Sequence, residues 1–139
     1  MKVYFAGSIR GGREEQSHYA SILRLLREHA EVLTEHVADA ELSSRGEDDR
    51  DDRFIHDRDM QWLTESDAIV AEVTAPSLGV GYEVGQSVAM GKPVLALFRE
   101  SSGRLLSAMI GGSPQVRLVR YRTVEELREP LRSFFEMLL

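Results

Sequence analysis

Five short, continuous apolar runs divide this chain, and longer segments with helical periodicity lie between most of them. Continuous rather than alternating apolar runs are typical of parallel strands that are covered on both faces. A chain in which such strands alternate with helices favours an open, doubly wound parallel sheet. The runs are Lys2–Ala6, Glu31–Thr34, Asp67–Val73, Pro93–Phe98 and Val116–Arg120.

The intervening segments complete a single α/β domain. Helical spacing of apolar residues predicts helices over about 14–29, 53–65 and 81–90, a short helical piece over 105–110, and an amphipathic C-terminal segment. Pro130 cannot donate within a helix, so we expect a kink there, or two consecutive helices with Pro130 in the first turn of the second. The expected fold of residues 1–139 is a flavodoxin- or Rossmann-like five-stranded parallel sheet with helices on both faces.

Composition excludes several classes of protein. A net charge of −6, with no basic stripe, argues against a nucleic-acid polymer as partner. The absence of cysteine excludes disulfides and thiolate metal sites. No signal peptide and no apolar run of membrane-spanning length is visible. We therefore expect no membrane association and a cytoplasmic protein, with a nuclear location equally compatible if the source is eukaryotic.

The segment after the first expected strand, Gly7-Ser8-Ile9-Arg10-Gly11-Gly12-Arg13, is a candidate phosphate cradle. Glycines allow backbone N–H groups to converge on an anion, and the serine and arginines add donors and positive charge. The spacing matches neither the dinucleotide fingerprint nor a Walker A loop. A simple glycine-rich connection between strand and helix is an equally good interpretation of this segment alone.

Two acids are candidates for chemistry near the carboxyl edge of the sheet. Glu83 follows the turn 76–81 and is expected in the first turn of the next helix, where the helix dipole favours an anion. Asp59 lies beside core-directed residues of the 53–65 helix, where partial burial would raise its pKa. Such a carboxylate pair suits glycosyl transfer, which needs one ionised and one proton-handling acid. The alternative for Asp59 is a structural ion pair with Arg58.

Other polar residues favour structural readings. His36 follows the second expected strand and could touch a ligand, although a hydrogen-bonded structural histidine is the simpler interpretation. The charge run Gly46–Arg53 matches no calcium-loop spacing, so we expect a solvated loop or the start of a helix, and no metal site.

Long motifs in this chain resemble the nucleoside 2-deoxyribosyltransferase superfamily, and within it the 2′-deoxynucleoside 5′-phosphate N-hydrolase branch. The resemblance covers nearly the whole chain and is carried by YFAGSIRGGRE (Tyr4–Glu14), VLTEHV (Val32–Val37), the IHxxDxxWL pattern at Ile55–Leu63, AEVTAPSLGVGYEVG (Ala71–Gly85) and SGRLLSAMI (Ser102–Ile110).

The resemblance implies hydrolysis of the N-glycosidic bond of 2′-deoxynucleoside 5′-monophosphates, such as 5-hydroxymethyl-dUMP, without cofactor or metal. Glu83 would be the nucleophile that forms a covalent deoxyribosyl intermediate, with Asp59 and Tyr4 orienting the sugar and managing the proton of the leaving base. Phosphate and sugar contacts would come from the residues that match the family's binding positions: Gly7, Ser8, Ile9, Arg10, Gly11, Ser77 and Gly79. Ser107 would reach the phosphate in the partner's site, which implies a homodimer.

Ser77 supports a phosphorylated substrate on physical grounds. Within the superfamily that this chain resembles, transferases that act on unphosphorylated nucleosides carry an acid at this position. An acid would repel a phosphate dianion, whereas a hydroxyl can donate a hydrogen bond to it.

Three alternatives remain open from the sequence. The first is deoxyribosyl transfer to an acceptor base, which uses the same covalent intermediate. The second is hydrolysis of ribonucleotides of the CMP type. The third, a non-catalytic nucleotide sensor on the same fold, is allowed because fold does not dictate function, but a sensor would not need Tyr4, Asp59 and Glu83 together.

Overall fold

The five expected strands form one parallel sheet in the computed structural model, which describes residues 1–8, 15–33 and 51–139. In chain order the elements are β1 (Lys2–Ala6), α1 (Gln16–Arg27), β2 (Glu31–Leu33), α2 (Asp52–Glu65), β3 (Ala68–Glu72), α3 (Leu78–Ala89), β4 (Val94–Arg99), the 3₁₀ helix η2 (Glu100–Ser102), α4 (Ala108–Gly111), β5 (Val116–Tyr121), the 3₁₀ helix η3 (Val124–Leu127) and α5 (Arg128–Leu138).

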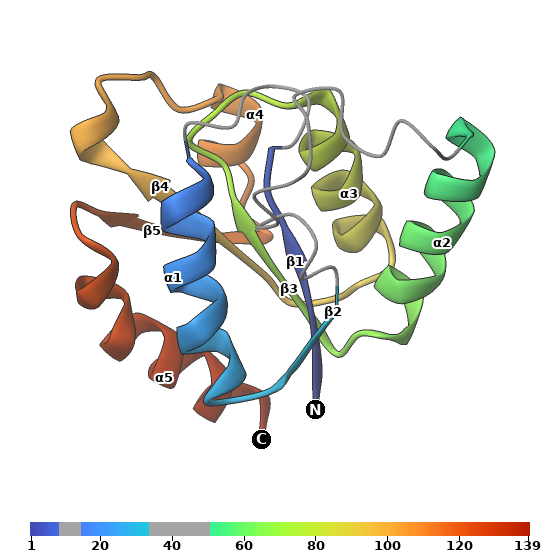
Figure 1. The fold of residues 1–139 in the computed structure, drawn as a ribbon, viewed down its shortest axis with the longest axis horizontal. Helices are drawn as coiled ribbons and strands as arrows, with labels where there is room; N and C mark the ends of the chain where they lie inside the picture. The colour runs from blue at the N-terminus through green and yellow to red at the C-terminus, as the bar shows by residue number, and fades with distance from the viewer. Residues whose placement is uncertain (9–14, 34–50) are drawn as a thin grey trace.

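The strand order β2-β1-β3-β4-β5 confirms the doubly wound topology, with β5 at an edge as the alternating charges within it indicate. The order reverses between β1 and β3, which pair in parallel with Tyr4 opposite Ile69. In open α/β sheets, ligands bind outside the carboxyl ends of the strands at such a reversal. This edge lies toward the top of Figure 1, the side on which α2 and α3 also begin.

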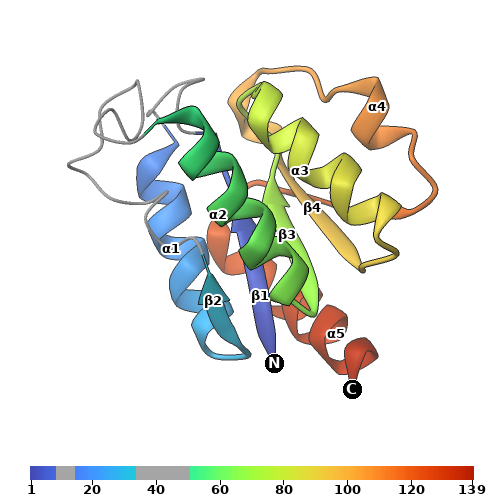
Figure 2. The same ribbon diagram turned by 90° about the vertical axis from the view of Figure 1, so that its right-hand side faces the viewer.

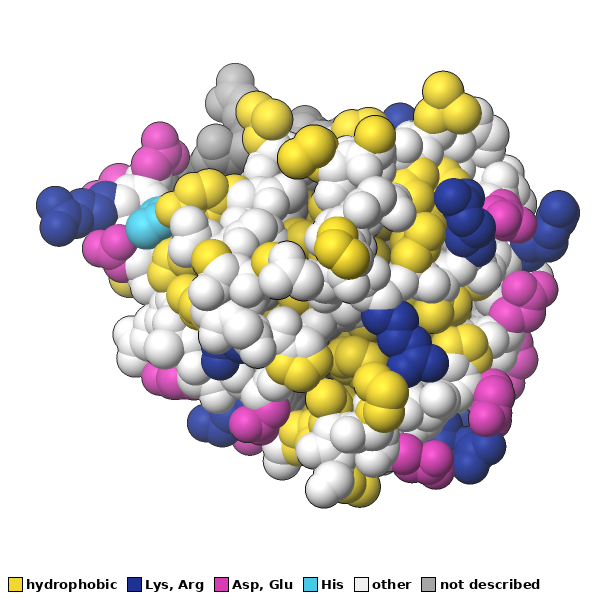
Figure 3. Space-filling view, turned by 180° about the vertical axis from the view of Figure 1, so that it is seen from behind, with side chains coloured by type: hydrophobic (Ala, Val, Ile, Leu, Met, Phe, Trp, Pro, Cys, Tyr) yellow, Lys and Arg dark blue, Asp and Glu magenta, His cyan; other side chains and the backbone are white. Residues whose placement is uncertain are grey.

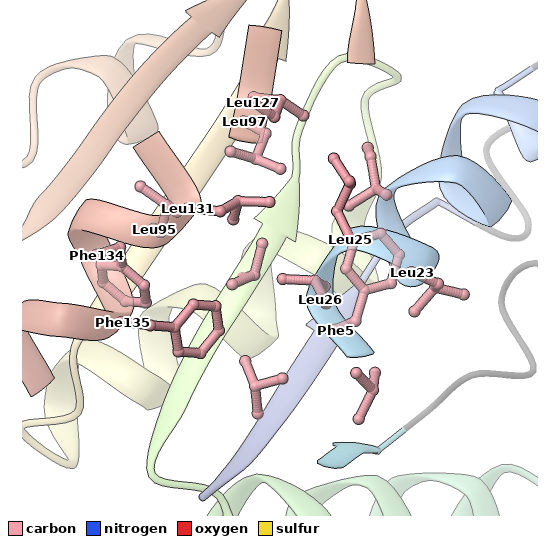
Figure 4. Close-up of a cluster of buried hydrophobic side chains, with 14 of the residues drawn as sticks. Phe5, Leu23, Leu25, Leu26, Leu95, Leu97, Leu127, Leu131, Phe134 and Phe135 are labelled. Carbon is pink, nitrogen blue, oxygen red and sulfur yellow. The ribbon is translucent and has the colours of Figure 1, made fainter. Parts of the chain in front are cut away.

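Each face of the sheet is covered by its own helices (Figures 1 and 2). On one face, α1 and α5 bury a large apolar cluster that includes Phe5, Leu26, Leu97 and Phe134 (Figure 4). On the other face, α2 and α3 pack against Tyr4, Ile69 and Ala96 through Leu63, Val80 and Val84. The face with α2 and α3 is the one that carries both acids singled out from the sequence.

Helix α3 begins at Leu78, three residues earlier than the sequence indicated. The side chain of Ser77 caps it by accepting a hydrogen bond from the Val80 amide (3.2 Å). Serine is among the best N-cap residues, because its oxygen satisfies an amide that the first helical turn leaves unpaired. Glu83 therefore lies in the second turn of α3 and not in the first.

The C-terminal segment confirms the expectation of two consecutive helices. Residues 124–127 form η3, and α5 follows at once with Pro130 in its first turn, where the missing N–H of proline removes no intrahelical bond. The short helical piece is smaller than expected, since α4 covers only Ala108–Gly111. Over the described part of the chain, no helix combines the length and the apolar character that crossing a membrane requires.

The α1–α5 core allows a direct test of the fold. Phe134 is 1% exposed and lies among apolar side chains from the sheet, so Phe134→Ala should lower the free energy of unfolding by about 3–5 kcal/mol in urea titrations. Leu139→Ala is the matched control, because Leu139 is 96% exposed and its truncation should change stability by less than about 0.5 kcal/mol. Equal effects of the two variants would contradict this packing.

Candidate active site

A tyrosine and a glutamate from distant parts of the chain meet beneath α3. Tyr4 projects from β1 and is 1% exposed, and its hydroxyl donates a hydrogen bond to Oε2 of Glu83. Glu83 is only partly buried, so its carboxylate lies between the apolar core and the surface. The strand thus fixes the orientation of the acid that the resemblance implies as the nucleophile.

Burial controls the charge of Glu83. Loss of hydration raises the pKa of Glu83 to about 7; the Tyr4 hydrogen bond lowers it, and the charge of Asp59 raises it further. This raised pKa overturns the expectation that the helix dipole favours the ionised form of Glu83. Glu83 is in the second turn, where the dipole has weakened, and no cation compensates its desolvation among the interactions that set its pKa.

Tyr4 remains a hydrogen-bond donor throughout the physiological range. Burial, followed by the charges of Glu83 and Asp59, raises the pKa of Tyr4 far above its ordinary value. A phenol that keeps its proton can hold one carboxylate oxygen in place, which leaves the other oxygen for a substrate. Tyr4 and Glu83 therefore form a preorganised pair.

Asp59 lies on α2 and carries the ion pair that the sequence offered as its structural alternative. Arg58 donates to Oδ1 of Asp59 from both Nε and Nη2, at 3.0 Å each. The two side chains are only 19% and 20% exposed. Asp59 is nevertheless near enough to Glu83 and Tyr4 to raise the pKa of both, so the ion pair and a place in the site are compatible.

At the end of β1, the structure describes the first two residues of the candidate phosphate loop. Ser8 is fully buried; its amide donates to the Tyr19 hydroxyl (3.1 Å), and its Oγ has no hydrogen-bond partner among the residues that the structure describes. Gly7 is packed tightly, since a Cβ there would lie 3.1 Å from the Tyr19 ring. Buried hydroxyls are normally satisfied, so the Ser8 Oγ is a candidate ligand donor. The other predicted contacts of this loop, Ile9, Arg10 and Gly11, lie outside the described residues, as does His36.

Ser77 and Ser107 line one apolar groove between α3 and α4. The groove has a volume of about 540 Å³ and includes Gly81, Met109 and Ile110 among its walls. Ser107 caps α4 by accepting from the Met109 amide (3.2 Å). Gly79 lies at the start of α3, and a Cβ there would meet nothing closer than the Ser77 Oγ, at 3.8 Å. The hydroxyl protons of both serines are not used by these caps.

Hydrophobic side chains gather over the middle of the face that carries α3 and α4 (Figure 3). Leu78 and Met109, which line the groove, are 96% and 83% exposed, and Leu105, which precedes α4 in the chain, is 93% exposed. Large exposed apolar side chains at a groove are typical of interaction surfaces. Among the residues that the structure describes, no three acidic or histidine side chains are grouped as metal ligands.

Sequence reasoning did not anticipate two features of the site. The contact between Tyr4 and Glu83 joins residues 79 positions apart and becomes visible only when α3 packs on β1. The aromatic side chains that stack on Arg58 could have been noticed, because Phe54 and Trp62 lie four residues before and after it on the same helix.

Comparison with known proteins places these features in a family. The family model described as nucleoside 2-deoxyribosyltransferase matches residues 3–113. A mouse protein named 5-hydroxymethyl-dUMP N-hydrolase is 55% identical over 99% of this chain and 81% of its own length. The zebrafish protein of the same name is 52% identical over 99% and 98%. A solved structure of CMP N-glycosidase from Clostridium botulinum shares the fold, with a TM-score of 0.62 and 21% identity over 95% of this chain and 99% of that one.

The raised pKa of Glu83 makes stability depend on pH in a defined direction. Because its pKa moves from 4.5 in the unfolded chain to about 7 in the fold, folding favours the protonated form, and stability is lost as the pH rises through this window. Glu83→Gln removes the buried charge and keeps an acceptor for Tyr4. Its thermal midpoint should exceed that of the wild type at pH 8 and match it near pH 5. A difference in thermal midpoint between Glu83→Gln and the wild type that is the same at pH 5 and pH 8 would contradict the raised pKa of Glu83.

Proposed function

This chain belongs to the nucleoside 2-deoxyribosyltransferase family, and we propose that it hydrolyses the N-glycosidic bond of 2′-deoxynucleoside 5′-monophosphates. The products are a free base and 2-deoxyribose 5-phosphate. The observation that carries this proposal is the Glu83 carboxylate held by the Tyr4 hydroxyl at the point where the strand order reverses. The mouse and zebrafish relatives, more than half identical over nearly the whole chain, support hydrolysis as the reaction.

In the first step, ionised Glu83 attacks C1′ of the deoxyribose. The new bond joins C1′ to Oε1, while Tyr4 holds Oε2; the C1′–N bond breaks, and its electron pair leaves with the base, which takes up a proton. The ester is uncharged, so its formation relieves the cost of a desolvated carboxylate. A buried nucleophile with its pKa near 7 is thus stabilised by reacting.

In the second step, water resolves the intermediate. Its oxygen bonds to C1′, the C1′–Oε1 bond breaks, and Glu83 is released as a carboxylate while the water loses a proton. Asp59 lies close enough to Glu83 and Tyr4 to orient the sugar and stabilise the positive charge that develops at C1′. Retention of configuration follows from two successive displacements at the same carbon.

Three features support a phosphate on the substrate. The buried Ser8 Oγ has no partner within residues 1–8, 15–33 and 51–139, the Ser77 hydroxyl proton is not used in capping, and the N-terminus of α3 favours an anion. The resemblance adds Gly7, Ile9, Arg10, Gly11 and Gly79 to this subsite. The names of the mouse and zebrafish relatives point to 5-hydroxymethyl-dUMP as the specific nucleotide.

We further propose a homodimer whose sites are shared. A second copy of this chain would cover the groove between α3 and α4, together with the exposed Leu78 and Met109 in its walls. Ser107 lines the same groove and would donate to the phosphate in the partner's site.

Substitution of the nucleophile tests the reaction. Wild-type enzyme should release base from 5-hydroxymethyl-dUMP and from ordinary deoxynucleotides, whereas Glu83→Gln should lower kcat by at least about 10³-fold and still bind nucleotide. Glu100→Gln, at an exposed acid on η2, is the matched control. The kcat/KM of the wild type should rise with pH through about 7, as Glu83 ionises.

Each competing reaction has its own signature in this assay. Wild-type rates for Glu83→Gln would remove Glu83 from the mechanism. A new nucleotide formed in the presence of a second free base would indicate transfer, and faster turnover of CMP than of dCMP would indicate a ribonucleotide N-glycosidase. Nucleotide binding without release of base would indicate a sensor.

If the site is shared between two copies of the chain, substitution of Ser107 should weaken nucleotide binding. Ser107→Ala should raise the Kd for deoxynucleotides about tenfold, because one donor to the phosphate is lost, and should leave binding of the unphosphorylated nucleoside unchanged. Sedimentation should show a dimer. A monomer that is fully active at assay dilution would contradict the shared site.

A further inference from the structure

Arg58 is held more firmly than an arginine on a helix surface usually is. Its guanidinium lies over the ring of Trp62, 4.8 Å from the centroid, and 5.7 Å from the centroid of the Phe54 ring. All three residues belong to α2, at i−4, i and i+4. The side chain is 19% exposed, so most of its length is packed. Stacking on aromatic faces removes rotamer freedom that arginine would otherwise retain.

The immobilised guanidinium is directed at the acid of the site. Nε and Nη2 of Arg58 both donate to the same oxygen of Asp59, at 3.0 Å each. Two charge-assisted hydrogen bonds from one rigid group fix the orientation of the carboxylate more strictly than a single contact would. Phe54 and Trp62 thus stack on Arg58, and Arg58 orients Asp59.

We propose that Arg58 is a positioning residue for the hydrolytic reaction, acting through Asp59. This inference rests on the proposed function, because Asp59 needs a defined orientation only if it acts on a sugar. The aromatic stack keeps Arg58 in place, and Arg58 holds the Asp59 carboxyl group beside the Tyr4–Glu83 pair. Arg58 thereby keeps Asp59 at the distance and angle from the substrate that the reaction requires. A misplaced carboxylate would no longer contribute in this way to the rate.

Electrostatics supports the same arrangement. Asp59 raises the pKa of both Glu83 and Tyr4, and the positive charge of Arg58 acts in the opposite direction on Tyr4. Asp59 and Glu83 are acids near one another, so an ionised carboxylate on one disfavours ionisation of the other. The Arg58 cation paired with Asp59 offsets part of this repulsion.

A double-mutant cycle tests the proposal. Arg58→Met keeps an unbranched apolar stem and removes the guanidinium; it should lower kcat about 10–100-fold and change the KM for deoxynucleotide less than about threefold, since phosphate contacts come from other elements. In the Asp59→Ala background, where there is no carboxylate to orient, the same substitution should change kcat less than about threefold. Arg58→Lys should recover only part of the loss, because an ammonium lacks the planar fork.

The control is Arg53→Met on the same helix. Arg53 is 90% exposed and pairs with the exposed Asp57 at 3.5 Å, so its removal should leave kcat unchanged. A loss from Arg58→Met that is equally large in the Asp59→Ala background, or a wild-type kcat for Arg58→Met, would overturn the positioning role. Absence of base release by the wild type would instead overturn the proposed function itself.

Discussion

The contact between the Tyr4 hydroxyl and the Glu83 carboxylate is the interaction on which the site depends. It requires a strand at the centre of the sheet, because Tyr4 must be buried between neighbours on both sides. It also requires α3 to pack directly on that strand, which Val80 and Val84 achieve through the apolar core. The same packing that stabilises the fold therefore withdraws water from Glu83 and raises its pKa.

A second tyrosine–glutamate pair on the opposite face shows what distinguishes the first. The Tyr121 hydroxyl donates to Glu72, which also accepts from the Thr74 amide at 2.7 Å and is fully buried. Burial raises the pKa of Glu72 as it does that of Glu83. Glu72 ties the ends of β3 and β5 together, whereas Glu83 is partly exposed beside the carboxyl edge. A raised pKa alone thus does not identify a nucleophile; access to a ligand does.

Particular residues explain how far the sequence could predict this molecule. Continuous apolar runs located every strand, because burial on both faces demands them, and Pro130 located the break before α5. The sequence predicts a start for α3 that is three residues too late, since glycines at 79 and 81 obscure a helix whose cap is Ser77. Local position in the helix predicts that the dipole favours an ionised Glu83, whereas burial by residues far along the chain raises its pKa. Long-range burial of this kind is not encoded in helical spacing.

Capping of α3 does not by itself explain why residue 77 is a serine. Aspartate caps a helix as well as serine does, so the start of α3 would form with either side chain. With serine, the oxygen accepts from the Val80 amide and the hydroxyl proton is left to donate elsewhere. An aspartate would cap the helix equally but present only acceptors and a negative charge to the same space. The hydroxyl is therefore explained by a substrate that carries an anion, which supports a nucleotide over a nucleoside.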